Sequence, residues 1–85
     1  MNSVRKAAEI DNCAKKAIHA LYGTDITDFK TRVVFPFPNE QKRDSWDVQV
    51  TFLLNGLQYT VDLIIQEKDG QITNARLIDT MKPIR

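Results

Sequence analysis

Apolar residues in the N-terminal quarter of the chain recur at spacings of three and four. This stripe consists of Ala7, Ile10, Ala14, Ala17, Ile18 and Leu21. Charged and polar residues fall mainly on the other side, which is the pattern of an amphipathic helix that covers a core. We therefore predict a helix over residues 4–21. Ser3 is its expected N-cap, and Gly23 is the expected residue of positive φ at its end.

The spacing then changes to two, and the centre of the chain predicts a β-hairpin. Strands over residues 45–54 and 57–67 flank Asn55-Gly56, the preferred dipeptide of a two-residue type I′ turn. A turn there forms five apolar pairs on one face: Trp46 with Ile65, Val48 with Leu63, Val50 with Val61, Phe52 with Tyr59, and Leu54 with Leu57. On the other face it pairs Thr51 with Thr60 and Gln49 with Asp62. A one-residue slip would oppose apolar and polar residues, so we expect this register to be strongly specified.

Residues 29–37 also alternate and predict a further strand. The residues expected on its core face are Phe29, Thr31, Val33, Phe35 and Phe37. Val34 is then expected to point away from the core. Pro36 and Pro38 cannot donate to a ladder, so we expect an edge strand or a bulge. A polar loop over residues 38–44 follows.

The last strand is predicted over residues 71–79, after a turn at Lys68-Asp69-Gly70. A two-residue loop would bring Asn74 and Arg76 onto the core face. A three-residue loop with Gly70 in a left-handed bulge would bring Thr73, Ala75 and Leu77 there instead. We favour the bulge, because it buries no unpaired guanidinium. Residues 80–85 are expected to form a tail.

These elements predict one α+β domain over residues 1–85, in the order α-β-β-β-β. One N-terminal helix packs on a four-stranded antiparallel meander, because the helix stripe and the apolar sheet face have only each other to cover them. The sequence contains no internal repeat and no low-complexity segment that would indicate a second domain.

The motif Trp46-x-Val48-x-Val50, followed by Tyr59-x-Val61-Asp62-Leu63 and Asp69-Gly70-x-Ile72, resembles cystatin-like modules of the PepSY and gas-vesicle accessory types. The resemblance covers residues 14–79. It implies a curved sheet around one helix and a non-catalytic binding or assembly role. The protease-binding loop of true cystatins, Gln-x-Val-x-Gly, is absent, because this chain has Leu54-Asn55-Gly56-Leu57 at its first hairpin. Protease inhibition is therefore not expected.

Composition narrows the classes of function. The chain has 85 residues and a net charge of +1, from 12 Lys and Arg against 11 Asp and Glu. Such a balance gives no general attraction to nucleic acid or anionic membranes. No apolar run is long enough to cross a bilayer, and we expect no signal peptide. A single cysteine suits a reducing compartment, so we expect a cytoplasmic protein. Small domains without disulfides often gain stability by oligomerisation.

Residues that carry chemistry are sparse, and we predict no catalytic, cofactor or metal site. Cys13 and His19 are six residues apart on the helix and so lie well round it from each other. Cys13 is expected at the margin of the helix–sheet contact, and His19 on the surface. Asp47 and Asp62 lie near each other on the polar sheet face, offset by one pair, where we expect ordinary solvated carboxylates.

Two surfaces remain as candidates for binding. The first consists of outward-pointing apolar residues: Val34, Leu53, Ile64 and Ile78, with Ile72 as the alternative to Ile78. It favours a non-catalytic protein-binding or assembly module, which self-associates or binds a partner through the outer sheet face or an edge strand. The second consists of basic residues: Lys30, Arg32, Lys42, Arg43 and Arg76. We rank nucleic-acid binding lower, because the aromatic residues are all expected to face inward. A small-molecule site between helix and sheet is a further alternative.

Overall fold

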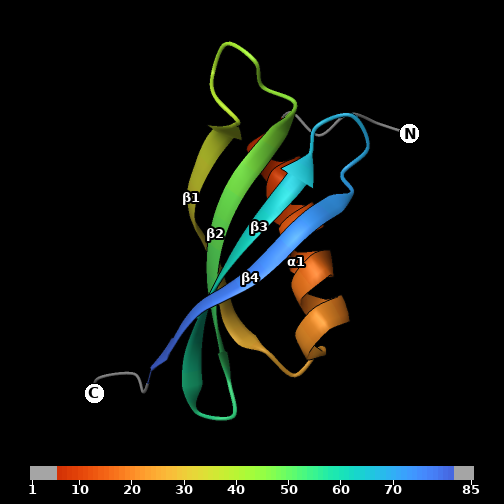
Figure 1. The fold of residues 1–85 in the computed structure, drawn as a ribbon. Helices are drawn as coiled ribbons and strands as arrows, with labels where there is room; N and C mark the ends of the chain where they lie inside the picture. The colour runs from red at the N-terminus through yellow and green to blue at the C-terminus, as the bar shows by residue number, and fades with distance from the viewer. Residues whose placement is uncertain (1–5, 82–85) are drawn as a thin grey trace.

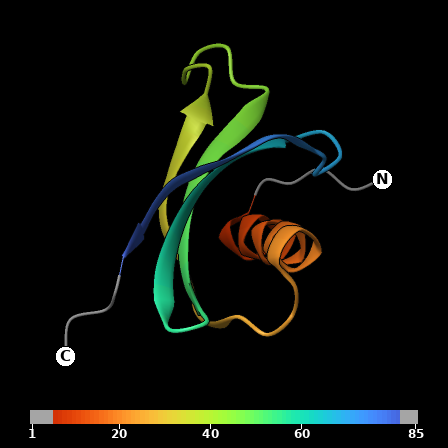
Figure 2. The same ribbon diagram turned by 60° about the horizontal axis from the view of Figure 1, so that its bottom comes forward.

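The computed structural model describes residues 6–81. Its elements are α1 (Ala7–Tyr22), β1 (Thr27–Phe37), β2 (Ser45–Leu54), β3 (Leu57–Gln66) and β4 (Ile72–Met81). The strands form one antiparallel sheet in the order β1-β2-β3-β4, and α1 lies across one of its faces (Figures 1 and 2). This confirms the predicted α+β meander. β4 extends two residues into the expected tail, whereas residues 4, 5 and 82–85 lie outside the described part.

Both ends of α1 are closed by hydrogen bonds. The backbone N–H of Lys6 donates to Oε1 of Glu9 at 2.9 Å, which satisfies one donor of the first turn. Ser3, the expected cap, lies outside the described residues. Gly23 has the expected positive φ, +95°, and its N–H donates to the carbonyl of His19 at 2.9 Å.

The core lies between α1 and the two central strands. Its helix residues are Ile10, Ala14, Ala17 and Ile18, and its strand residues are Val48, Val50, Phe52, Val61, Leu63 and Ile65. The buried alanines let the helix axis approach the sheet closely. Ala7 and Leu21 were also expected in this stripe, but both are exposed, because they lie near the ends of the helix and outside the core.

An aromatic cluster joins the end of α1 to the central hairpin. The rings of Phe52 and Tyr59 stack at 5.3 Å between centroids, and the ring of Tyr22 contacts both, at 5.2 and 5.6 Å. Offset and edge-on ring pairs of this kind add roughly 0.5–1.5 kcal/mol to the effect of burial alone. The cluster therefore anchors the C-terminal turn of the helix to the sheet.

The predicted register of the central hairpin is confirmed at every pair. Asn55 and Gly56 have φ angles of 53° and 79°, as a type I′ turn requires. The strongest local signal in the sequence thus sets the two strands on which the rest of the sheet is built.

The prediction for β1 is wrong beyond Thr31. Thr31 pairs with Val50 on the core face as expected, but a register shift follows, and Val33 pairs with Gln49 on the opposite face. Arg32 is the extra residue of this β-bulge. Because a shift of one residue exchanges the two faces of a strand, the side chains beyond it are reversed. Phe35 and Phe37 therefore point away from α1, and Val34 pairs with Val48 on the core side.

The three-residue turn that we favoured before β4 is confirmed by the strand pairing at the centre of β4. Ala75 pairs with Leu63 and Leu77 with Val61 on the core face, and Gly70 has a positive φ. Thr73, however, does not lie on that face as expected. A register shift leaves it as an extra residue, and Ile72 pairs with Ile65 in its place. β4 is thus one open edge of the sheet, and β1 is the other, as its prolines predicted.

Candidate functional site

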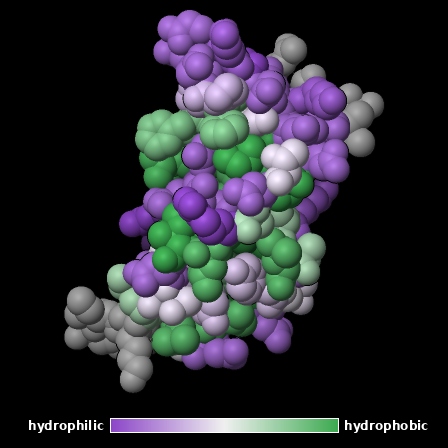
Figure 3. Space-filling view, viewed as in Figure 1, coloured by the Kyte–Doolittle hydropathy of each residue, from purple (hydrophilic) through white to green (hydrophobic). Residues whose placement is uncertain are grey.

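The sheet face opposite α1, here called the outer face, is not covered by any of residues 6–81 (Figure 2). Viewed from this side, apolar and polar side chains alternate over the strands (Figure 3). One row crosses all four strands at the middle of the sheet and consists of Val33, Gln49, Asp62 and Arg76. The neighbouring row contains Phe35, Asp47, Ile64 and Asn74.

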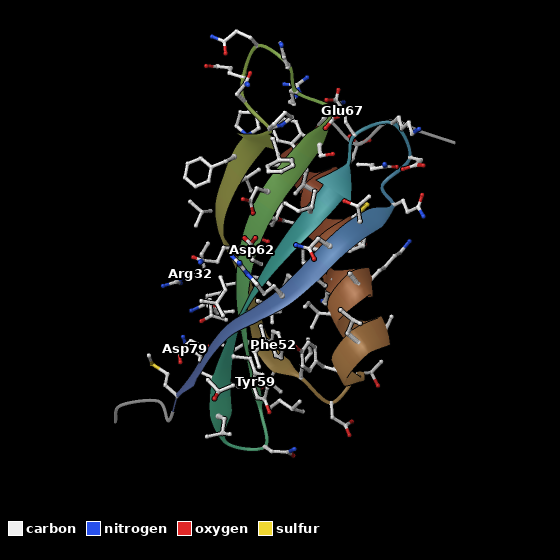
Figure 4. The ribbon with its side chains drawn as sticks, in the orientation of Figure 1. Arg32, Phe52, Tyr59, Asp62, Glu67 and Asp79 are labelled. Carbon is white, nitrogen blue, oxygen red and sulfur yellow. The ribbon has the colours of Figure 1, made fainter. Side chains whose placement is uncertain are left out.

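These two rows enclose a shallow depression of about 260 Å³, here called the outer hollow. Its lining residues are Val33, Phe35, Asp47, Gln49, Asp62, Arg76 and Ile78. The central strands supply both carboxylates, and the edge strands supply the apolar walls and the guanidinium. Asp62 lies near the middle of the sheet in Figure 4.

The hollow changes the acidity of one carboxyl. Partial burial raises the pKa of Asp62 from 3.8 to about 6, and a hydrogen bond and charge repulsion from the Asp47 carboxyl act in the same direction. The nearby Arg76 opposes them only in part. The two carboxyls were expected to be ordinary solvated groups. The pKa of Asp62 shows that this carboxyl instead holds its proton more tightly than an isolated aspartate does.

Exposed apolar side chains border this pair. Phe35 is 59% exposed and Ile78 46% exposed, and they lie on the two edge strands, β1 and β4, where both line the outer hollow. Phe37 and Met81 extend the apolar surface toward the two ends of the outer face. Isolated exposed apolar residues are common, but several of them on one uncovered sheet face favour an interaction site.

The four partner-binding residues predicted from the sequence do not form one patch. Ile78 is exposed on the outer face, and Leu53 is half-buried there. Ile64 is on that face but only 8% exposed, so little of it can reach a partner. Val34 lies on the other face, because the bulge at Arg32 reverses it. Sequence reasoning missed Val33, Phe35 and Phe37 for the same reason.

The predicted basic residues are scattered over the molecule. Lys30 and Arg32 lie at the β1 edge, Arg76 is in the outer hollow, and Lys42 and Arg43 are in the loop after β1 (Figure 4). Two of the five are engaged in ion pairs. Nζ of Lys30 is 3.7 Å from Oδ1 of Asp28, and Nε of Arg43 is 2.6 Å from Oε1 of Glu67. The Arg43 guanidinium also lies 4.6 Å from the Trp46 ring centre.

Two open grooves flank α1 on the other face. One lies between the helix and β1 and has a volume of about 820 Å³, and one lies between the helix and β4 and has a volume of about 460 Å³. A helix roughly 10–12 Å wide cannot cover four strands, whose axes span about 14 Å. The centre of the gap between helix and sheet is filled by core side chains with no exposure, such as Ala14 and Val50. The expected small-molecule site would therefore have to use a flanking groove.

Cys13 is partly buried against the core, at the margin where it was expected, and His19 is half-buried. Residues 6–81 contain no group of three or more His, Cys, Asp or Glu side chains that could hold a metal ion. Nor does this part of the chain contain a helix with the length and apolarity that a membrane crossing requires.

No protein-family model matches the sequence, and neither a curated protein nor a solved structure is significantly similar to it. The cystatin-like resemblance therefore remains a prediction.

Proposed function

We propose that this chain is a small non-catalytic module that binds protein through the outer face of its sheet. The observation that carries the proposal is a pair of exposed apolar side chains, Phe35 on β1 and Ile78 on β4, that flank the outer hollow on a sheet face that no described residue covers. Exposed aromatic and apolar side chains among polar residues are typical of protein interfaces. A small domain has little apolar surface to spare from its core, so leaving these side chains in water is a cost that binding would remove.

The charges of the outer face favour protein over nucleic acid. The face carries Asp47, Asp62 and Asp79 against Arg76 and Lys30, and Lys30 forms an ion pair with Asp28. Phosphates would be repelled by this excess of carboxylates. The exposed phenylalanines could stack on bases, but the cationic groove that accompanies such stacking is absent from the described outer face.

The proposal is tested by comparing two variants of equal exposure. Phe35→Asp places a charge at the wall of the outer hollow, and Leu21→Asp is the matched control, because Leu21 is 56% exposed at the end of α1. We expect any protein retained from a native extract by the immobilised wild-type chain to be retained by Leu21→Asp and lost with Phe35→Asp. Loss with Leu21→Asp alone, or with neither variant while both are folded by circular dichroism, would refute the outer face as the binding surface.

Self-association is the simplest form of this function. Two outer faces could pack against each other around a two-fold axis, because each presents exposed apolar side chains. Light scattering over about a hundredfold range of concentration distinguishes this case. A dimer that Phe35→Asp dissociates would identify the partner as a second copy, whereas a monomer would direct the search to a different protein.

A further inference from the structure

The outer hollow combines features that one kind of partner would satisfy. It has apolar walls from the edge strands and a carboxyl pair at its floor, and the face around it has an excess of carboxylates. We propose that the outer hollow receives a Lys or Arg side chain from an otherwise apolar segment of a protein partner. This inference rests on the proposed function and specifies the chemistry of the partner.

The size of the hollow favours a single side chain. About 260 Å³ lies below the roughly 300–1,000 Å³ of pockets that hold small molecules. A Lys or Arg side chain has a long apolar stem with a charged end, so its stem can lie against apolar walls while its charge reaches a carboxylate. Phe35 and Ile78 stand on opposite edge strands beside the hollow and supply such walls. Phe35 also offers a ring to a cation.

Charge complementarity requires the partner to be cationic. An apolar partner that covered the hollow would remove water from Asp47 and Asp62, and a desolvated carboxylate without a counter-charge is costly. Arg76 is the guanidinium that lines the hollow, and it leaves the pair with a net negative charge when both carboxyls are ionised. One additional cation restores neutrality, whereas an acidic or phosphorylated partner would add repulsion.

Binding of a cation should be linked to release of a proton. The groups that face Asp62 are Asp47 from β2 and Arg76 from β4, while β1 contributes the uncharged Val33 and Phe35. With a pKa of about 6, Asp62 is mostly protonated at pH 5 and mostly ionised at pH 7.5. The ionised fraction of Asp62 is then about tenfold larger at pH 7.5 than at pH 5. Because the ionised form binds the cation, affinity for a basic segment should be about tenfold higher at pH 7.5 than at pH 5.

The test uses random twelve-residue peptides displayed on phage and selected on the immobilised full chain at pH 7.5. Peptides that also bind the Phe35→Ser variant, which loses the apolar wall without adding a charge, are removed. We expect the remaining peptides to share a Lys or Arg next to apolar residues. One enriched peptide is then titrated against the wild-type chain, Asp47→Asn/Asp62→Asn and the control Asp79→Asn. Affinity should fall at least about tenfold in the double variant and change less than about twofold in the control.

The outcomes separate the inference from the function on which it rests. Enriched peptides without a basic residue, or equal affinity of the double variant, would overturn the cationic partner but leave an apolar binding face. Peptides whose capture does not depend on Phe35 would contradict both. A basic peptide whose affinity does not change between pH 5 and pH 7.5 would show that the Asp47–Asp62 pair is not its receptor and would also overturn the inference.

Discussion

At the scale of the residue, the Asp62 carboxyl links the folded state to pH. Its pKa in the folded chain, about 6, is above its ordinary value of 3.8, so the folded state binds more protons than the unfolded state between these two values. The stabilising effect of the protonated form is complete below about pH 4 and is lost as the pH rises through about 6. Above that range the ionised pair destabilises the fold.

The substitution Asp62→Asn removes this dependence. The free energy of unfolding of the variant, relative to that of the wild-type chain, should rise by about 1 kcal/mol when the pH is raised from 4 to 7.5. The rise is smaller than the pKa change alone would give, because water reaches the carboxyl pair and screens its charges. Urea denaturation of both chains at the two pH values measures the difference. Asp79→Asn, on the exposed part of the same face, should show no comparable change. A gain for Asp79→Asn and none for Asp62→Asn would contradict the assignment.

A second prediction concerns the turn of the central hairpin. Gly56 has a φ of 79°, and a Cβ added there would meet no atom within 4 Å, so only the backbone conformation opposes substitution. Gly56→Ala should therefore cost about 1–2 kcal/mol of stability. Thermal unfolding measures this as a lower melting temperature. Unchanged stability would mean that the turn can adopt another conformation without loss.

At the scale of the element, the contact between α1 and the sheet depends on small side chains. Ala14 has no exposed surface, so the larger side chain of Ala14→Leu would have to displace the strands beneath it. We expect a loss of about 1–3 kcal/mol, measured by urea denaturation. The matched change Ala20→Leu places the same side chain at the groove beside β4, where there is room, and should be neutral or slightly stabilising. Equal effects at both positions would contradict the close helix–sheet contact.

The elements also show which parts of the fold could be predicted from the sequence. The central hairpin was predictable in full, because Asn55-Gly56 defines the turn and one face alone is apolar in both strands. β1 was predictable as an edge strand, but the face that it turns toward the core after Thr31 was not. Val33 and Val34 are adjacent and equally apolar, so either face of the strand could be assigned to the core after Thr31. Only pairing with β2 shows that Arg32 is the extra residue.

The same bulge explains how much of the candidate site was predictable. The proximity of Asp47 and Asp62 follows from the hairpin register and was expected. The raised pKa of Asp62 was not, because it depends first on burial in the outer hollow, which Phe35 and Ile78 also line. Phe35 reaches the outer face through the β1 bulge. Ile78 occupies a second bulge, in β4. An edge strand has one neighbour instead of two, and its irregularities are therefore weakly encoded in local sequence.

At the scale of the whole molecule, one helix covers one face of a four-stranded sheet and leaves the other face partly apolar. The molecule measures about 41 × 23 × 19 Å. The carboxyl pair lies on its central strands, Phe35 on the edge strand β1, and Phe37 and Met81 toward its ends. The account predicts that these side chains become inaccessible together when the partner binds.

The most direct measurement is hydroxyl-radical footprinting of the chain alone and in complex with the protein that it retains from a native extract, or as a dimer if it self-associates. Mass spectrometry then reports the oxidation of each exposed side chain. We predict that oxidation of Phe35, Phe37 and Met81 falls several-fold in the complex, while that of Leu21 at the end of α1 is unchanged. Protection of Leu21 with undiminished oxidation of Phe35 would show that the partner binds the helix side and would contradict the account.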